Sequence, residues 1–84
     1  MSDEVIQKKV VDLLESLFLH TQFTEDMFEV QLTDPSIGLD AVRMYELLLC
    51  IEKEFLISYT FEELHTNGFH SVNEIVHSIK IKLS

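Results

Sequence analysis

Three stretches of the chain carry apolar residues at helical spacing, and this spacing constrains the fold more than any other feature. In the first stretch the intervals between successive apolar residues are four, three, one and three, at Ile6, Val10, Leu13, Leu14 and Leu17. One face of an α-helix repeats every three to four residues, so the pattern predicts an amphipathic helix over about residues 3–19. Ser2 is expected to cap its amino end.

Two capping signals follow in the last third of the chain. Thr60 and Glu63 fit a capping box, in which a hydroxyl and a carboxylate each accept the other residue's backbone amide, and Ser71 and Glu74 fit a second one. The first box predicts a helix of about two turns that ends near residues 67–68, and the second predicts a final helix. The apolar stripe of the final helix should consist of Val72, Ile75, Val76, Ile79 and Leu83.

The central stretch "SIGLDAVRMYELLLCIEKEF" predicts a helix that begins at Asp40, whose side chain can accept an amide of the first turn. One apolar line along it suits the core, namely Met44, Leu47, Leu48, Ile51 and Phe55. A second line consists of Val42, Tyr45 and Leu49. Either this helix is buried on most sides, or the second line, edged by Glu46 and Glu52, is an exposed docking strip.

The segment between the first two helices is too apolar for a free linker, because it holds Phe23, Phe28, Val30, Leu32, Ile37 and Leu39. It is expected to pack across the domain, with a helical turn after Thr24. No strand pattern competes with the helical ones. The sequence therefore predicts an all-α fold of three longer helices and one short one, in a single domain over residues 1–84.

The charge of the chain limits its partners. Fifteen acidic residues against six basic ones give a net charge of −9, which disfavours nucleic acid and anionic membranes and favours proteins with basic patches. No apolar run reaches the roughly 18 residues of a membrane span, and "MSDEVIQKK" does not resemble a secretory signal. Cys50 is the sole cysteine, so no internal disulfide is possible. We expect a cytoplasmic protein.

Enzymatic signatures are weak. The chain has two glycines, too few for a glycine-rich phosphate loop, and its cysteine and histidines do not have zinc-site spacing. The neighbouring carboxylates Glu62 and Glu63 would point apart on a helix, which does not suit an acid–base pair. We therefore expect no catalytic residue, no metal site and no enzymatic activity.

The run "GLDAVRMYELLLCIEKEF" resembles the helix-two signature of acyl and peptidyl carrier proteins, in which Gly-x-Asp-Ser-Leu leads into an apolar helix with an acidic end. The resemblance covers nearly the whole chain. It implies a four-helix bundle of acyl-carrier-protein type that carries intermediates as thioesters on a 4'-phosphopantetheine arm. Under this match Asp40 is the motif aspartate, Val42 stands at the motif leucine, and Ala41 occupies the position of the serine that bears the arm.

Alanine lacks the hydroxyl to which the arm is attached, so the chain as written cannot be modified at position 41. Three explanations compete: a deliberate serine-to-alanine substitution that keeps the carrier unmodified, a natural loss of modification, or attachment at Ser36 or Ser58. The intact surrounding motif favours the first. The third is weak because neither serine follows a capping aspartate.

The resemblance also implies partners. They are a phosphopantetheinyl transferase, whose magnesium Asp40 helps to hold, and acyl- or aminoacyl-loading and processing enzymes with basic docking surfaces. These enzymes would meet a monomeric carrier at Val42, Arg43, Tyr45, Glu46 and Leu49. "DAVRM" is similar to aryl carrier domains of siderophore assembly, whereas "CIEKEF" is closer to stand-alone acyl carriers, so fatty-acid, polyketide and nonribosomal peptide pathways all stay open. The alternative function is a non-carrier, acidic helical adaptor that binds a protein through the same helix.

Overall fold

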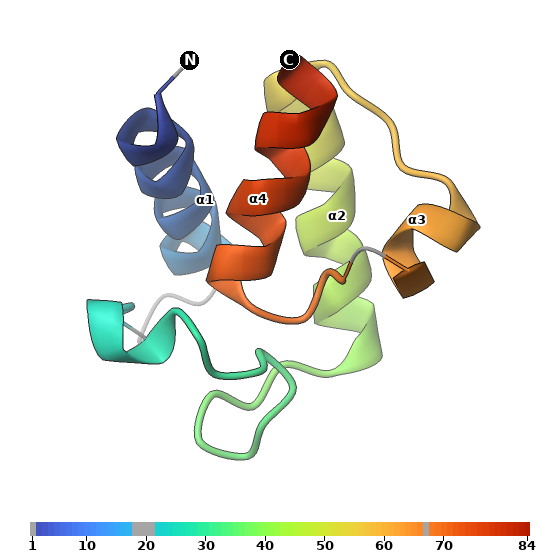
Figure 1. The fold of residues 1–84 in the computed structure, drawn as a ribbon. Helices are drawn as coiled ribbons and strands as arrows, with labels where there is room; N and C mark the ends of the chain where they lie inside the picture. The colour runs from blue at the N-terminus through green and yellow to red at the C-terminus, as the bar shows by residue number, and fades with distance from the viewer. Residues whose placement is uncertain (1, 18–21, 67) are drawn as a thin grey trace.

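Four α-helices and one short 3₁₀ helix form the regular structure of the described residues. The computed structural model describes residues 2–17, 22–66 and 68–84, and within them it contains no strand. The elements are α1 (Asp3–Leu17), the 3₁₀ helix η1 (Glu25–Met27), α2 (Ala41–Phe55), α3 (Phe61–Thr66) and α4 (Val72–Leu83) (Figure 1). The predicted all-α fold, with three longer helices and one short one, is therefore confirmed.

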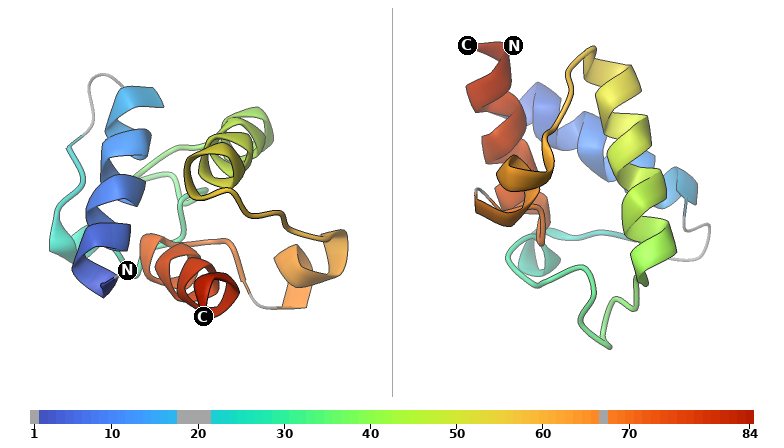
Figure 2. Two further views of the ribbon diagram at one scale, coloured as in Figure 1. Left: turned by 90° about the horizontal axis from the view of Figure 1, so that it is seen from above. Right: turned by 90° about the vertical axis from the view of Figure 1, so that its right-hand side faces the viewer.

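The three longer helices enclose the core, and α3 lies outside them (Figure 2). Helix α1 packs against both α4 and α2. The buried apolar residues include most of the predicted stripes together with the connection between α1 and α2, namely Ile6, Val10, Leu14, Phe23, Phe28, Leu32, Leu39, Leu47, Leu48, Ile51, Phe55, Phe69, Val72, Ile75, Val76 and Ile79. Among the described helices, none combines the length and the hydropathy that crossing a bilayer requires.

The amino end of α1 forms as its sequence predicts. The backbone N–H of Val5 donates to the Ser2 hydroxyl at 3.3 Å, which is the expected cap. The helix is described to Leu17, so the last two residues of the predicted range, 18–19, lie outside the described residues. Leu13 is only partly buried, at the edge of the stripe.

The connection between α1 and α2 packs across the bundle as predicted, and η1 forms the helical turn after Thr24. Two backbone hydrogen bonds join it to the start of α4: the N–H of Leu32 donates to the carbonyl of His70 at 2.6 Å, and that of Asn73 donates to the carbonyl of Phe28 at 3.1 Å. Gly38 has φ +86°, a left-handed conformation that glycine adopts without strain just before α2.

Helix α4 departs from its prediction in two ways. The Ser71 hydroxyl accepts the N–H of Glu74 at 3.2 Å as expected, but the Glu74 carboxylate accepts the N–H of His70 at 3.0 Å rather than that of Ser71. Leu83, predicted as part of the apolar stripe, lies in the last turn of α4 and is 40% exposed. The stripe therefore ends at Ile79.

Two isoleucines of α4 allow a matched test of this core. Ile75 is fully buried and Ile81 is 53% exposed. We expect Ile75→Ala to lower the free energy of unfolding by about 2 to 5 kcal/mol, because it removes buried methyl groups and leaves a cavity. Ile81→Ala should change it by no more than about 0.5 kcal/mol. Urea denaturation followed by circular dichroism measures both values, and equal losses would contradict the assignment of the buried face.

Candidate functional site

Position 41 lies at the exposed amino end of α2. Ala41 is the first residue of the helix and its side chain is exposed. Asp40 is the N-cap as predicted: its Oδ1 accepts the backbone N–H of Arg43 at 2.8 Å. The first amides of an α-helix have no partner within the helix, and the aligned peptide dipoles make this end positive. A group attached at position 41 would thus project into solvent beside a fixed, electropositive helical turn.

The second apolar line of α2 is exposed. Val42, Tyr45 and Leu49 are 66%, 61% and 46% exposed, so the interpretation that α2 is buried on most sides is wrong. We call these three residues the α2 strip. Arg43 and Glu46 form an exposed ion pair beside it, with Nη1 and Oε2 3.4 Å apart. All five predicted partner-binding residues therefore lie along α2 in the two turns that follow position 41.

The carboxylate of Glu52, which the sequence placed at the edge of this strip, is engaged in a hydrogen bond within the fold. Its Oε2 accepts the backbone N–H of Tyr59 at 2.8 Å, which fastens the segment between α2 and α3 back onto α2. That segment begins at Leu56, which ends α2 in the left-handed conformation, with φ 55°. The Glu52 carboxylate is thus part of the fold, and Glu46 is the acidic neighbour of the strip.

A cleft of about 460 Å³ opens between α2 and α3, and Ala41 is one of its lining residues. One wall comes from α2 and the other from α3, and the loops at their ends complete it; the lining residues are Thr33, Ala41, Met44, Tyr45, Leu48, Phe61, Leu64, His65, Phe69 and His70. Most of these side chains are apolar. The cleft therefore provides apolar surface, directly beside position 41, against which an apolar group could pack.

Sequence reasoning missed this cleft. Phe61 and Leu64 gave the only signal: they lie three residues apart in "FEEL", so both fall on one side of α3. Phe61 is 76% exposed, and its ring meets that of His65 edge to face with centroids 4.4 Å apart. His65 and His70, whose spacing in the sequence does not suit a zinc site, both line the same cleft. The sequence did not predict that these four residues would lie opposite α2 and line a cleft with it.

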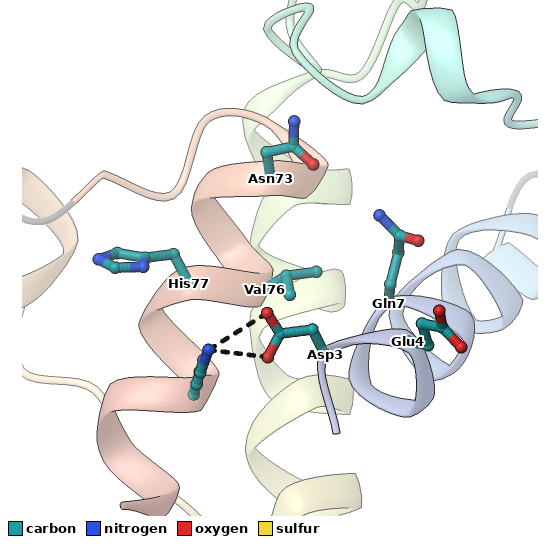
Figure 3. A pocket seen from close by; sticks show the side chains of 7 residues that line it. Asp3, Glu4, Gln7, Asn73, Val76 and His77 are labelled. Carbon is teal, nitrogen blue, oxygen red and sulfur yellow. Dashed lines mark hydrogen bonds and ion pairs between the residues drawn. The ribbon is translucent and has the colours of Figure 1, made fainter. Parts of the chain in front are cut away.

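A second hollow, of about 260 Å³, lies between α1 and α4 and is lined mostly by residues with polar or charged side chains (Figure 3). Of the described residues that line it, Val76 is apolar and the others are Asp3, Glu4, Gln7, Asn73, His77 and Lys80. The ion pair between Lys80 Nζ and Asp3 Oδ1, at 3.0 Å, crosses it. Ala41 and the α2 strip take no part in it, so this hollow is not the site that the sequence motif predicts.

Among the described residues, two polar contacts join α4 to α3 and to the segment that leads into α3. Lys82 Nζ lies 2.5 Å from Glu63 Oε2, and the Tyr59 hydroxyl is 2.7 Å from Ser78 Oγ. The hydrogen bond and charge of Lys82, helped by the backbone N–H of Thr60, hold the pKa of Glu63 below its ordinary value. Burial raises the pKa of Tyr59, which keeps its hydroxyl protonated as a hydrogen-bonding group.

Comparisons of the chain with models of protein families, with curated proteins and with solved structures found no match.

The lowered pKa of Glu63 predicts how acid acts on α3. A carboxylate whose pKa is lower in the folded protein stabilises it above the ordinary pKa, here 4.5, and this contribution is lost as the pH falls through the lowered value. Amide exchange of α3, corrected for its intrinsic pH dependence, should therefore accelerate over this window. Glu63→Gln should remove the pH-dependent part while keeping an oxygen for the capping box. An unchanged pH profile in this variant would contradict the assignment.

Proposed function

We propose that this protein is a carrier protein, in which a serine at position 41 would bear a 4'-phosphopantetheine arm and present acyl, aminoacyl or aryl thioesters to successive enzymes. The observation that carries the proposal is the exposed first turn of α2, which combines the motif aspartate as its cap with an apolar cleft that begins at the attachment position. The arm holds the intermediate as a thioester, and the protein supplies the attachment site and a surface that partner enzymes recognise.

The local electrostatics suit the arm's point of attachment. A phosphodiester is an anion, and an anion at the amino end of a helix meets unpartnered amides and the positive end of the helix dipole. Asp40 keeps this turn in place through its hydrogen bond to the N–H of Arg43. The same carboxylate is expected to help a phosphopantetheinyl transferase hold magnesium, which would explain why an aspartate rather than a serine caps this helix.

The α2 strip suits partners that visit briefly. Its three apolar side chains give contact area, and Glu46 with the net charge of −9 attracts enzymes that carry basic docking surfaces. Electrostatic attraction of this kind raises association rates without requiring high affinity, which a carrier that must leave each enzyme in turn needs. Loading and processing enzymes that share this surface would each meet position 41 at the same edge of their interface.

Ala41 favours a second candidate function. Because it has no hydroxyl, the chain as written cannot carry the arm there, and an adaptor that binds one protein through the α2 strip would need no arm. The codon for position 41 in the source genome distinguishes a deliberate substitution from a natural alanine. The two functions differ most sharply in what a restored serine would do.

The first test restores that serine. We expect the Ala41→Ser variant, incubated with coenzyme A and a broad-specificity phosphopantetheinyl transferase, to gain the mass of one arm by intact-mass spectrometry. The unchanged chain should gain none, although it contains Ser36 and Ser58. Asp40→Asn in the Ala41→Ser background should slow the transfer, because asparagine caps a helix as well as aspartate but carries no charge for magnesium.

Each other outcome has a distinct meaning. A folded Ala41→Ser variant that gains no mass would favour the adaptor over the carrier. A mass gain by the unchanged chain would place attachment at another serine, and peptide mapping would decide between Ser36 and Ser58.

The second test uses the α2 strip and a matched leucine. Leu49 on α2 and Leu83 on α4 are 46% and 40% exposed. In the Ala41→Ser background, Leu49→Ala should lower the kcat/KM of the transferase by about 5- to 30-fold, the equivalent of about 1 to 2 kcal/mol for an interface contact. Leu83→Ala should leave it unchanged. Equal kcat/KM values for the two variants would show that the transferase does not use the strip.

A further inference from the structure

Helix α3 forms one wall of the cleft but contributes little to the core. It has six residues, fewer than an isolated helix needs to be stable in water. None of its side chains from Phe61 to His65 is fully buried. By contrast, the buried core residues come from α1, α2, α4 and the connecting segments. Leu64 packs against the core but is only partly buried, so the place of α3 depends more on its tethers to the rest of the molecule than on hydrophobic burial of its own.

One of these tethers is the ion pair of Glu63 and Lys82, which is more shielded from water than the Lys80–Asp3 pair between α4 and α1. Its side chains are 19% exposed for Lys82 and 32% for Glu63, whereas those of the Lys80–Asp3 pair are 56% and 62% exposed. Shielding from water strengthens a charge-assisted hydrogen bond, and exposed pairs contribute little. Lys82 Nζ also lies 5.0 Å from the centroid of the Tyr59 ring, on the segment that leads into α3.

Glu63 connects this pair to the start of α3. Its Oε1 accepts the backbone N–H of Thr60 at 2.9 Å, while its Oε2 meets Lys82. One carboxylate thus closes the first turn of α3 and fastens that turn to the last turn of α4. Phe61 and Leu64, which flank Glu63 in the sequence, are the apolar residues that α3 contributes to the cleft.

We propose that Glu63 and Lys82 are positioning residues, which set the place of α3 against α2 and thereby the opening of the cleft beside position 41. Neither residue lines the cleft itself, so both act through α3. Loss of the pair would free α3 to move outward while the core of α1, α2 and α4 stays intact. If the protein is a carrier, as proposed above, this opening would govern how an apolar cargo enters and leaves the cleft. The coupling between the ion pair and the cleft does not depend on the carrier function.

The test uses the chain as it stands, without arm or partner, so it succeeds or fails independently of the carrier proposal. Three variants remove the charges: Lys82→Met, Glu63→Gln and the double variant, of which Glu63→Gln keeps the capping oxygen. Lys80→Met is the matched control, because Lys80 also lies in the last turn of α4 but pairs with Asp3 of α1. Lys82→Arg is the conservative variant that should retain the pair.

Two measurements report on α3 and on the opposite wall. We expect amide exchange in α3 to accelerate by about 3- to 10-fold in each charge-removing variant, with no change in α1, because a charged hydrogen bond of a locally opening unit is lost. The methyl resonance of Met44, on the α2 wall, should shift in the same variants, while that of Met27, outside the cleft lining, stays in place. A role confined to stability would not move the Met44 signal.

The double variant should behave like either single one, because the second substitution removes a partner already lost. Lys82→Arg and Lys80→Met should match the unchanged protein. Three results would overturn the proposal: additive effects in the double variant, equal acceleration in α1 and α3, or an unmoved Met44 signal in folded Glu63→Gln. If Lys82→Met fails to fold, Glu63→Gln alone decides the question.

Discussion

Helix α2 has to satisfy two opposite requirements, and the rest of the structure is arranged around them. Leu47, Ile51 and Phe55 bury one side of it, packed with α1, and so hold the helix in the bundle. The opposite side, with Tyr45 and Leu49, remains in solvent. A chain of 84 residues has few apolar side chains to spare, so three exposed ones on a single helix are a cost to solubility that a binding surface would explain.

The amino end of α2 combines a tight turn, a side-chain cap and an exposed first residue. Gly38 adopts a left-handed conformation before the helix, and the Asp40 side chain caps the first turn by a hydrogen bond. Ala41 follows and is exposed. A fixed turn of this kind would suit the proposed point of attachment, where a tethered group must leave the protein in a constant direction and beside a constant surface.

The two walls of the cleft are held in place by different interactions. The α2 wall is part of the bundle, but the α3 wall is secured by Glu63, Lys82 and the hydroxyl pair of Tyr59 and Ser78. The Glu63–Lys82 ion pair depends on pH, on screening by salt and on the approach of other charges, whereas buried apolar side chains carry no charge to be titrated or screened. One wall of the cleft can therefore respond to its surroundings while the fold remains unchanged.

What the sequence alone determined is local. Helical periodicity placed the stripes of α1, α2 and α4, and side chains that cap their own helix ends, as Asp40 and Thr60 do, were readable because each partner lies within four residues. The position of the motif around Ala41 was equally readable, although its function remains a proposal. These features need no knowledge of how the helices pack.

Only the tertiary structure decided whether the second apolar line of α2 is buried or faces solvent, because periodicity marks that line as apolar but does not show whether another helix covers it. The same holds for contacts between residues far apart in the chain. No local sequence pattern predicts the ion pair between Glu63 and Lys82. The same is true of the hydrogen bonds that Tyr59 makes, through its hydroxyl with Ser78 and through its backbone N–H with Glu52. The cleft beside position 41 likewise exists only because the fold places α3 opposite α2, and no residue spacing in the sequence predicts this arrangement.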